Sequence, residues 1–288
     1  MKKAPLILSL LMIVQSTILA QSNEMRFDII YPRASTDFDP RNAFSLAVLD
    51  LVMSNASVTY TIQPSKYLME RSRALIELEN GNSINLYWTS MSKEHEKNLL
   101  PIRIPINRGL IGYRVLVIKK DRQADFDQVQ TLDDLKKFTA IQGIGWIDIE
   151  ILKHAGLKVE TGKYDTIFKM AQLGRIDYIP RGIAEGYAEI KAHADTEPDL
   201  TIEKGLLLKY KSDFLFYTNK KNEALAQAIE KGFKIAYQDG SYMELFNSHP
   251  FIQDALKQAN LANRRVLTLE SIHLSAEDQA IPSMYWMQ

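Results

Sequence analysis

The stretch AIQGIGWIDIEIL, residues 140–152, joins a β-prone run to an apolar run with helical spacing. Gly143, Gly145 and the large indole of Trp146 lie at the junction. The start of a helix leaves backbone N–H groups without intrahelical partners, so such a turn can offer them to a polar or anionic group. We therefore expect an α/β unit whose turn hydrogen-bonds a ligand beneath Trp146. A purely structural strand-to-helix turn is the alternative.

Strands and helices alternate on both sides of this turn. Residues 113–120 and 175–182 are predicted strands, because apolar and β-branched residues dominate both runs. Apolar spacing predicts helices over 147–156, 164–174 and 183–194, the first two ending at a glycine. These elements form a small α/β unit.

The flanking sequence predicts a second, larger unit of the same class. Residues 25–33, 57–64 and 83–90 have strand character, and residues 42–55 and 66–81 have helical periodicity. This β-α-β-α-β order favours a mainly parallel sheet covered by helices. A long helix is predicted over 222–240.

We therefore predict an α/β, bilobed protein with two mainly parallel sheets and the smaller unit inserted into the larger one. The first lobe comprises residues 21–114 and 213–288, and the second lobe comprises 115–212. Two extended crossings, near 113–117 and 211–215, would form the hinge. Ligands bind beyond the carboxyl ends of strands in open α/β sheets, so the cleft between the lobes is the expected site.

The first twenty residues have the parts of a cleavable secretory signal. Lys2 and Lys3 precede the apolar run LILSLLMIV, which is too short to span a bilayer, and a small residue follows at Ala20. No cysteine follows that could carry a lipid. We expect cleavage after residue 20 and a free protein in the periplasm.

Composition excludes several classes of protein. The 35 basic and 35 acidic residues give a formal charge of zero, which argues against a nucleic-acid partner. The absence of cysteine excludes disulfides, thiol catalysis and cysteine-ligated zinc. The five histidines have no metal-binding spacing. We expect a monomer with no cofactor and no metal.

Four stretches, in this order, resemble a known family: SMSKEHEKNLLPIRIPI (90–106), TLDDLKKFTAIQGIG (131–145), LGRIDYIPRGIAEG (173–186) and QDGSYMELF (238–246). Together with the leader they are similar to the type II periplasmic solute-binding proteins, in the amino-acid-binding (family 3) branch of ABC-transporter substrate-binding proteins. The resemblance implies a protein that closes on a small ligand like a hinge. It would deliver that ligand to the membrane subunits of a transporter or to a membrane sensor.

The resemblance also implies site residues. Ser90 and Ser92 match a serine-rich turn that helps to bind the ligand. An arginine usually follows and clamps the α-carboxylate of an amino acid. Here that place is near Lys97, with Arg103 and Arg114 on nearby strand-like pieces. Lysine offers a point charge rather than the planar fork of arginine.

A second departure concerns the residue that follows the 175–180 strand. The family typically has an aspartate there that holds the ligand's ammonium group, whereas this chain has Arg181. The corner would then be cationic. We therefore expect a small polar or anionic ligand, amino-acid-like but not an ordinary zwitterionic amino acid.

Three residues complete the predicted site from their places near strand ends. Tyr31 and Trp88 would be stacking walls and Arg33 would supply charge, although Trp88 also fits a core position and Arg33 a solvated one. An ion pair competes with ligand contact for Arg103. The full predicted ligand-binding set is Tyr31, Arg33, Trp88, Ser90, Ser92, Lys97, Arg103, Arg114, Gly143, Gly145, Trp146 and Arg181.

Two other functions remain open at this stage. A dehydratase-like enzyme on the same scaffold would need a paired acid and base, for which Asp148 and Glu185 are the candidates. A descendant of the fold that binds nothing would lack convergent polar groups in its cleft. A nucleotide site is disfavoured, because GIGWID has Asp148 where the dinucleotide fingerprint needs a third glycine.

Overall fold

The computed structural model describes residues 25–33 and 40–287. The predicted secretion signal, residues 1–20, lies outside them. Within the described ranges no helix has both the length and the apolar character needed to cross a membrane.

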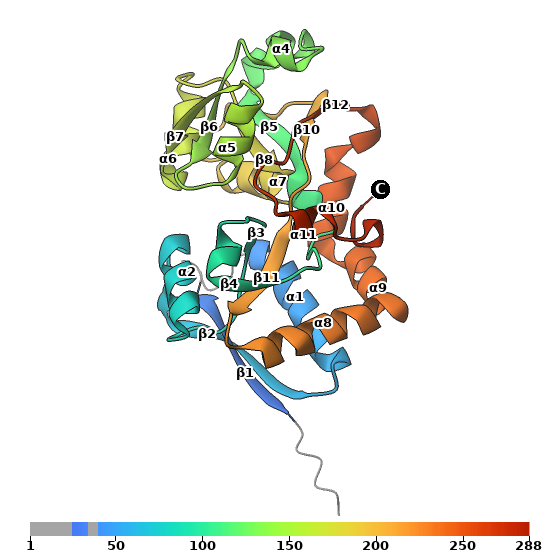
Figure 1. Cartoon of the computed structure of the whole chain (residues 1–288). Helices are drawn as coiled ribbons and strands as arrows, with labels where there is room; N and C mark the ends of the chain where they lie inside the picture. Colours follow the sequence, from blue (N-terminus) through green and yellow to red (C-terminus); the bar gives the residue numbers. More distant parts are fainter. Residues whose placement is uncertain (1–24, 34–39, 288) are drawn as a thin grey trace, which may run out of the picture.

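The first lobe forms the lower half of the molecule in Figure 1. Its elements are β1 (Arg26–Arg33), α1 (Pro40–Asn55), β2 (Thr59–Leu68), α2 (Arg71–Asn80), β3 (Tyr87–Ser90), β4 (Leu99–Ile102), β11 (Phe214–Asn219), α8 (Glu223–Gln238) and α9 (Ser241–Ser248). β1 and β2 pair in parallel, and β11 lies antiparallel between β3 and β4. The backbone N–H groups of Asn85 and Leu86 both donate to the carbonyl of Ile30, which joins the two sets of strands.

The second lobe forms the upper half. Its elements are β5 (Tyr113–Lys119), α3 (Gln123–Asp127), α4 (Leu132–Leu135), β6 (Thr139–Gly143), α5 (Asp148–His154), β7 (Lys158–Gly162), α6 (Tyr164–Gln172), β8 (Ile179–Gly182), α7 (Ile183–Ala192), β9 (Leu200–Ile202) and β10 (Leu206–Lys209). β5 is central and pairs with β8, β9 and β10. Both of its faces are buried, because Val115 and Val117 enter one apolar cluster and Leu116 and Ile118 another.

The sheets are mixed rather than mainly parallel. Among the described strands, three pairs are parallel and five are antiparallel. The antiparallel pairs all involve β5 or β11, the strands that follow the two crossings between the lobes. Each of these strands runs antiparallel to its neighbours. The parallel pairing expected from a β-α-β order therefore occurs only where one helix joins consecutive strands, as in β1–β2 and β6–β7.

Both crossings pass through a tightly packed segment beside β5. The buried carboxylate of Asp213 accepts hydrogen bonds from the backbone N–H groups of Asn107 and Gly109. A Cβ on Gly112 would lie 1.9 Å from the carbonyl oxygen of Tyr210, so only glycine allows the two crossing chains this approach. Asp213 and Gly112 therefore hold the two crossings together.

The C-terminal part differs from the expectation that residues 213–288 stay with the first lobe. α10 (Pro250–Ala259) packs on α7 of the second lobe and on α9 of the first. β12 (Arg265–Thr268) then pairs in parallel with β10. The chain returns to the first lobe at α11 (Ala276–Gln279), where Ser275 donates to Glu96 (Figure 1). Two further crossings thus accompany the two that the sequence predicts.

Candidate functional site

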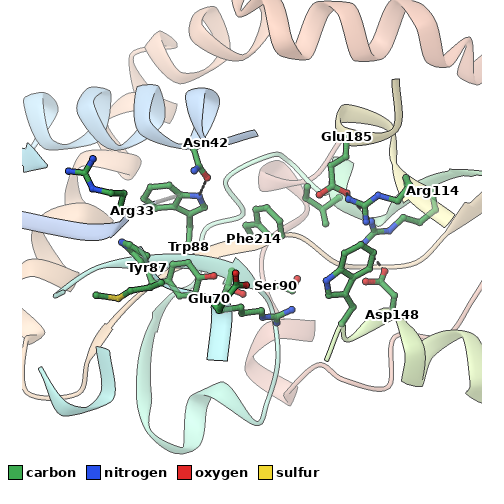
Figure 2. A pocket seen from close by; sticks show the side chains of 17 residues that line it. Arg33, Asn42, Glu70, Tyr87, Trp88, Ser90, Arg114, Asp148, Glu185 and Phe214 are labelled. Carbon is green, nitrogen blue, oxygen red and sulfur yellow. Dashed lines mark hydrogen bonds and ion pairs between the residues drawn. The ribbon is translucent and has the colours of Figure 1, made fainter. Parts of the chain in front are cut away.

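A cavity of about 320 Å³ lies between the lobes. Figure 2 shows side chains from both lobes pointing into it. The first lobe contributes Pro32, Arg33, Asn42, Met69, Glu70, Arg71, Tyr87, Trp88, Thr89, Ser90 and, from β11, Phe214. The second lobe and the crossing before it contribute Ile111, Arg114, Trp146, Asp148, Arg181 and Glu185.

Trp88 is a fixed part of the first-lobe wall. Its indole nitrogen donates to the Asn42 side-chain oxygen at 3.2 Å, and its ring lies 5.2 Å from that of Tyr31. The edge of Phe216 contacts it from β11, with ring centres 6.1 Å apart. Trp88 is only 6% exposed, so it serves both as core and as cavity wall. Tyr31 does not line the cavity and instead supports this ring.

Trp146 is the corresponding indole of the second lobe. It packs against Gly143, where a Cβ would lie 2.3 Å from the ring. On the cavity side, the Arg181 guanidinium carbon lies 4.4 Å from the centre of the Trp146 ring, within the range of a cation–π contact. The glycine before the turn is therefore required to seat the indole.

The second-lobe arginines are held by carboxylates. Arg181 binds Glu189 through two nitrogens at 2.6 and 2.7 Å, and lies 3.4 Å from Glu185. Arg114 lies 2.6 Å from Asp148 and 3.3 Å from Glu185, as the right side of Figure 2 shows. Two guanidinium groups thus face three carboxylates. The charges of the four groups that line the cavity balance, and Glu189, which does not line it, brings the network to a formal charge of −1. The cationic corner expected at Arg181 is neutralised by residues of α7.

Asp148 is a poor candidate for a general base. Burial alone would raise its pKa, but Arg114 and a hydrogen bond from the Tyr210 hydroxyl outweigh burial and hold the pKa below its ordinary value. Glu185 accepts hydrogen bonds from Arg114 and from the backbone N–H of Gly182. Both candidate residues for acid–base chemistry line the cavity, but both are bound to arginine.

No family model and no curated protein sequence matches this chain. Solved structures do match. An ancestral arginine-binding protein bound to arginine is 18% identical over 76% of this chain and 96% of its own, with a TM-score of 0.55. A P235GK mutant of the arginine-binding protein ArgBP from T. maritima is 21% identical over 77% and 93%, with a TM-score of 0.51.

A third match comes from work on glutathione import through GshT and the cystine ABC importer TcyBC of Streptococcus mutans. It is 14% identical over 78% of this chain and 95% of its own, with a TM-score of 0.56. The chain has the bilobed fold of these binding proteins. This confirms the predicted α/β, two-lobed architecture, and the cavity lies between the two lobes of that fold.

In the strand-to-helix turn at residues 143–146, two of the backbone N–H groups already have partners within the turn or the neighbouring strand. The N–H of Ile144 donates to Gly162, and the N–H of Trp146 donates to Gly143. Neither Gly143 nor Gly145 lines the cavity: the first is covered by Trp146, and the second has a left-handed φ of 79° and is exposed. The turn therefore lines the cavity with the Trp146 indole and not with its glycines.

Three polar residues of the predicted set also lie outside the cavity. Lys97 is exposed and pairs with Glu94 at 2.6 Å. Arg103 binds Glu96 at 2.7 Å and lies 3.4 Å from Asp278 of the C-terminal segment, so the ion-pair alternative describes it. Ser92 is buried and accepts the backbone N–H of Glu94.

Six of the twelve predicted residues line the cavity: Arg33, Trp88, Ser90, Arg114, Trp146 and Arg181. The residues that the sequence analysis missed include Glu70 and Arg71. They lie just beyond the end of β2, but the sequence predicts a helix from residue 66, whereas β2 continues to Leu68. If the strand is taken to end at Leu68, both residues lie near a strand end and become candidates for the site. No group of metal-ligating side chains occurs among residues 25–33 and 40–287.

Proposed function

We propose that this protein is an exported solute-binding protein that captures a small polar ligand between its lobes. The observation that carries this proposal is the cavity itself, which two indoles line from opposite lobes. Trp88 comes from β3 of the first lobe and Trp146 from the turn before α5 of the second lobe. A planar or apolar part of a ligand would be held between them, and polar groups at the rim would fix its orientation.

Capture would follow from movement of the lobes. A ligand that contacts both walls stabilises the closed arrangement by its extra contacts there, and this shifts the population toward closure. The crossings beside Gly112 and Asp213 would act as the hinge. The lobes would be residues 21–114 and 115–212, with the C-terminal segment shared between them.

The destination of the ligand is proposed from the relatives in fold. Another match is named as the substrate-binding protein of an amino acid ABC transporter, with 18% identity and a TM-score of 0.52. Together with the positively charged and apolar start of the sequence, this supports export to the periplasm. The partner would be the membrane subunits of a transporter or a membrane sensor, with the protein itself a monomer.

The ligand would be small and polar, and amino-acid-like compounds are the first class to test. The cavity volume suits a molecule of that size, and both signs of charge line it. The pairing of Arg114 and Arg181 with carboxylates removes the argument that the second lobe selects an anion. An ordinary amino acid is therefore compatible with this wall.

The proposal is tested by mass spectrometry of small molecules released from the natively purified, exported protein. A screen of the L-amino acids, their short peptides and small carboxylic acids by calorimetry follows. A compound recovered unchanged that rebinds with one-to-one stoichiometry supports the proposal. Conversion of the bound compound would favour the enzyme alternative, and the absence of any bound or rebinding compound would favour a descendant that binds nothing.

A further inference from the structure

The four arginines that line the cavity differ in how they are bound. Arg114 and Arg181 are held by buried carboxylates, as described above. Arg33 donates from its Nε to the backbone carbonyl of Ser65 at 2.9 Å. Within the described part of the chain, Arg71 alone of the four has no hydrogen bond and no ion pair.

Arg71 is also placed where its charge would be felt inside the cavity. It is the first residue of α2 and is half-buried. Its charge acts on two groups of the same wall, the Tyr87 hydroxyl and the His95 ring. Tyr87 lines the cavity, whereas the half-buried His95 is neutral because burial and Arg71 lower its pKa to about 4. Neither of these two groups neutralises the arginine. Glu70, the residue before Arg71, also lines the cavity, but no ion pair joins it to Arg71 within the described residues.

We propose that Arg71 is the anion-binding residue of the cavity and that it takes a carboxylate group of the ligand. A guanidinium offers a planar pair of donors that matches a carboxylate. The Ser90 side chain lines the same wall and offers a further hydroxyl. This inference rests on the proposed function and names the residue that determines its specificity.

The opposite wall defines the rest of the ligand. The network of Arg114, Arg181, Asp148, Glu185 and Glu189 has no net positive charge, so it offers no free cation to a second anionic group. We therefore infer a ligand with a single carboxylate that lies toward α2. Its remaining part, which faces the second lobe, is neutral or cationic. A dicarboxylate would place its second charge against Glu185 or Asp148.

The first arm of the test compares variants of the full chain. Arg71→Gln removes the charge at similar size, and Arg71→Lys keeps the charge but loses the planar fork. Arg73→Gln is the matched control, because Arg73 lies on the same helix, is 60% exposed and does not line the cavity. Circular dichroism and thermal melting show whether each variant is folded.

The second arm compares ligands. The probes are L-arginine, L-glutamine and L-glutamate, each with its α-carboxamide, together with any further binder from the screen. Loss of a charge-assisted hydrogen bond predicts a roughly ten- to hundredfold weaker Kd for the acid with Arg71→Gln. Arg71→Lys is intermediate and Arg73→Gln binds as the wild type does. Each α-carboxamide should bind the wild type as weakly as the corresponding amino acid binds Arg71→Gln. L-glutamate should bind the wild type less tightly than L-glutamine does.

The outcomes separate the two levels of the proposal. If a carboxylate ligand binds Arg71→Gln as tightly as it binds the wild type, Arg71 is not the anion-binding residue, although the solute-binding function stands. If the tight ligands carry no anionic group, or carry two, the inferred ligand class is wrong. If none of the compounds binds the wild type, both the proposed function and this inference fail.

Discussion

Glu189 binds Arg181 through both of its carboxylate oxygens, at 2.6 and 2.7 Å, and the same guanidinium lies against the Trp146 ring. The arginine is 3% exposed and the glutamate 5%. The pair thus fixes the position of a guanidinium on which one indole wall of the cavity rests. We therefore predict that Arg181 acts on the ligand by positioning Trp146.

Removing one partner of this pair leaves a buried charge. We expect Glu189→Leu to lower the free energy of unfolding by about 3 kcal/mol, because the substitution leaves the buried guanidinium of Arg181 without its main carboxylate partner. Glu185, 3.4 Å from Arg181, keeps the loss from being larger. In the double variant Arg181→Met with Glu189→Leu neither charge remains, and urea denaturation should show that most of the lost free energy of unfolding is recovered. As a control, Glu230→Ala, which breaks the exposed 2.7 Å pair with Lys234, costs less than about 1 kcal/mol. A double variant no more stable than the single one would contradict this interpretation.

Trp146 lines the cavity, and we predict that it supplies contact area to the ligand in addition to its contact with Arg181. Trp146→Ala is expected to weaken the Kd of the ligand about tenfold or more, and Trp146→Phe by less, because the phenyl ring keeps part of the stacking. The ligand-induced change in tryptophan fluorescence shrinks in both variants. Trp286, which packs beside Gly109 and does not line the cavity, is the control. If Trp146→Ala binds the ligand with the same Kd as the wild type, Trp146 does not contact the ligand.

Gly112 permits the close approach of the two crossing chains. In Gly112→Ala the new Cβ would lie 1.9 Å from the Tyr210 carbonyl oxygen, and backbone cannot move aside cheaply. We expect a loss of at least about 2 kcal/mol in unfolding free energy. Gly174→Ala is the comparison: its φ of 67° disfavours alanine, but no other atom lies within 4 Å of the added methyl. That variant should lose about 1 kcal/mol. Equal losses in urea denaturation would mean that the crossing is not tightly packed.

His273 makes stability depend on pH. The ring is buried and neither nitrogen has a partner within the described structure, and burial lowers its pKa to about 4 from 6.5. The unfolded chain takes up a proton below pH 6.5 while the folded chain does not. Stability is therefore lost as pH falls from 6.5 toward 4. Between pH 7.5 and pH 5 the wild type should lose 1 to 2 kcal/mol more than His273→Leu does, roughly the linkage expected for this shift. Parallel pH profiles for the two proteins would contradict this.

Most helices and strands of the fold can be predicted from local patterns in the sequence. The alternation of strands and helices and the long helix α8 follow from periodicity within a few residues, and both are present. The mixed sheets could not be read in the same way, because β5 and β11 take their direction from the crossings between lobes. The strand character of β12 is masked by arginine and polar neighbours, so its pairing with β10 was not foreseen.

The site shows the same division. Trp88, Ser90 and Arg181 could be predicted because each lies at or next to a strand end. The pairing of Arg114 with Asp148 joins residues 34 positions apart in sequence, which no local pattern reveals. Glu185 and Glu189 did leave a signal in the sequence. They lie four residues apart on the helix that begins two residues after Arg181, so both side chains can reach back to the end of β8.

Closure of the lobes can be measured directly, because the chain has no cysteine and two can be introduced for labelling. Glu79→Cys on α2 and Glu160→Cys on β7 place dyes on exposed positions of opposite lobes. Single-molecule energy transfer on the mature protein should show the distance between the dyes shortening when the identified ligand is added. The half-saturation point should match the Kd from calorimetry, and Arg71→Gln should move it to higher concentration. A distance that stays unchanged at saturating ligand would contradict a cavity that closes between two lobes.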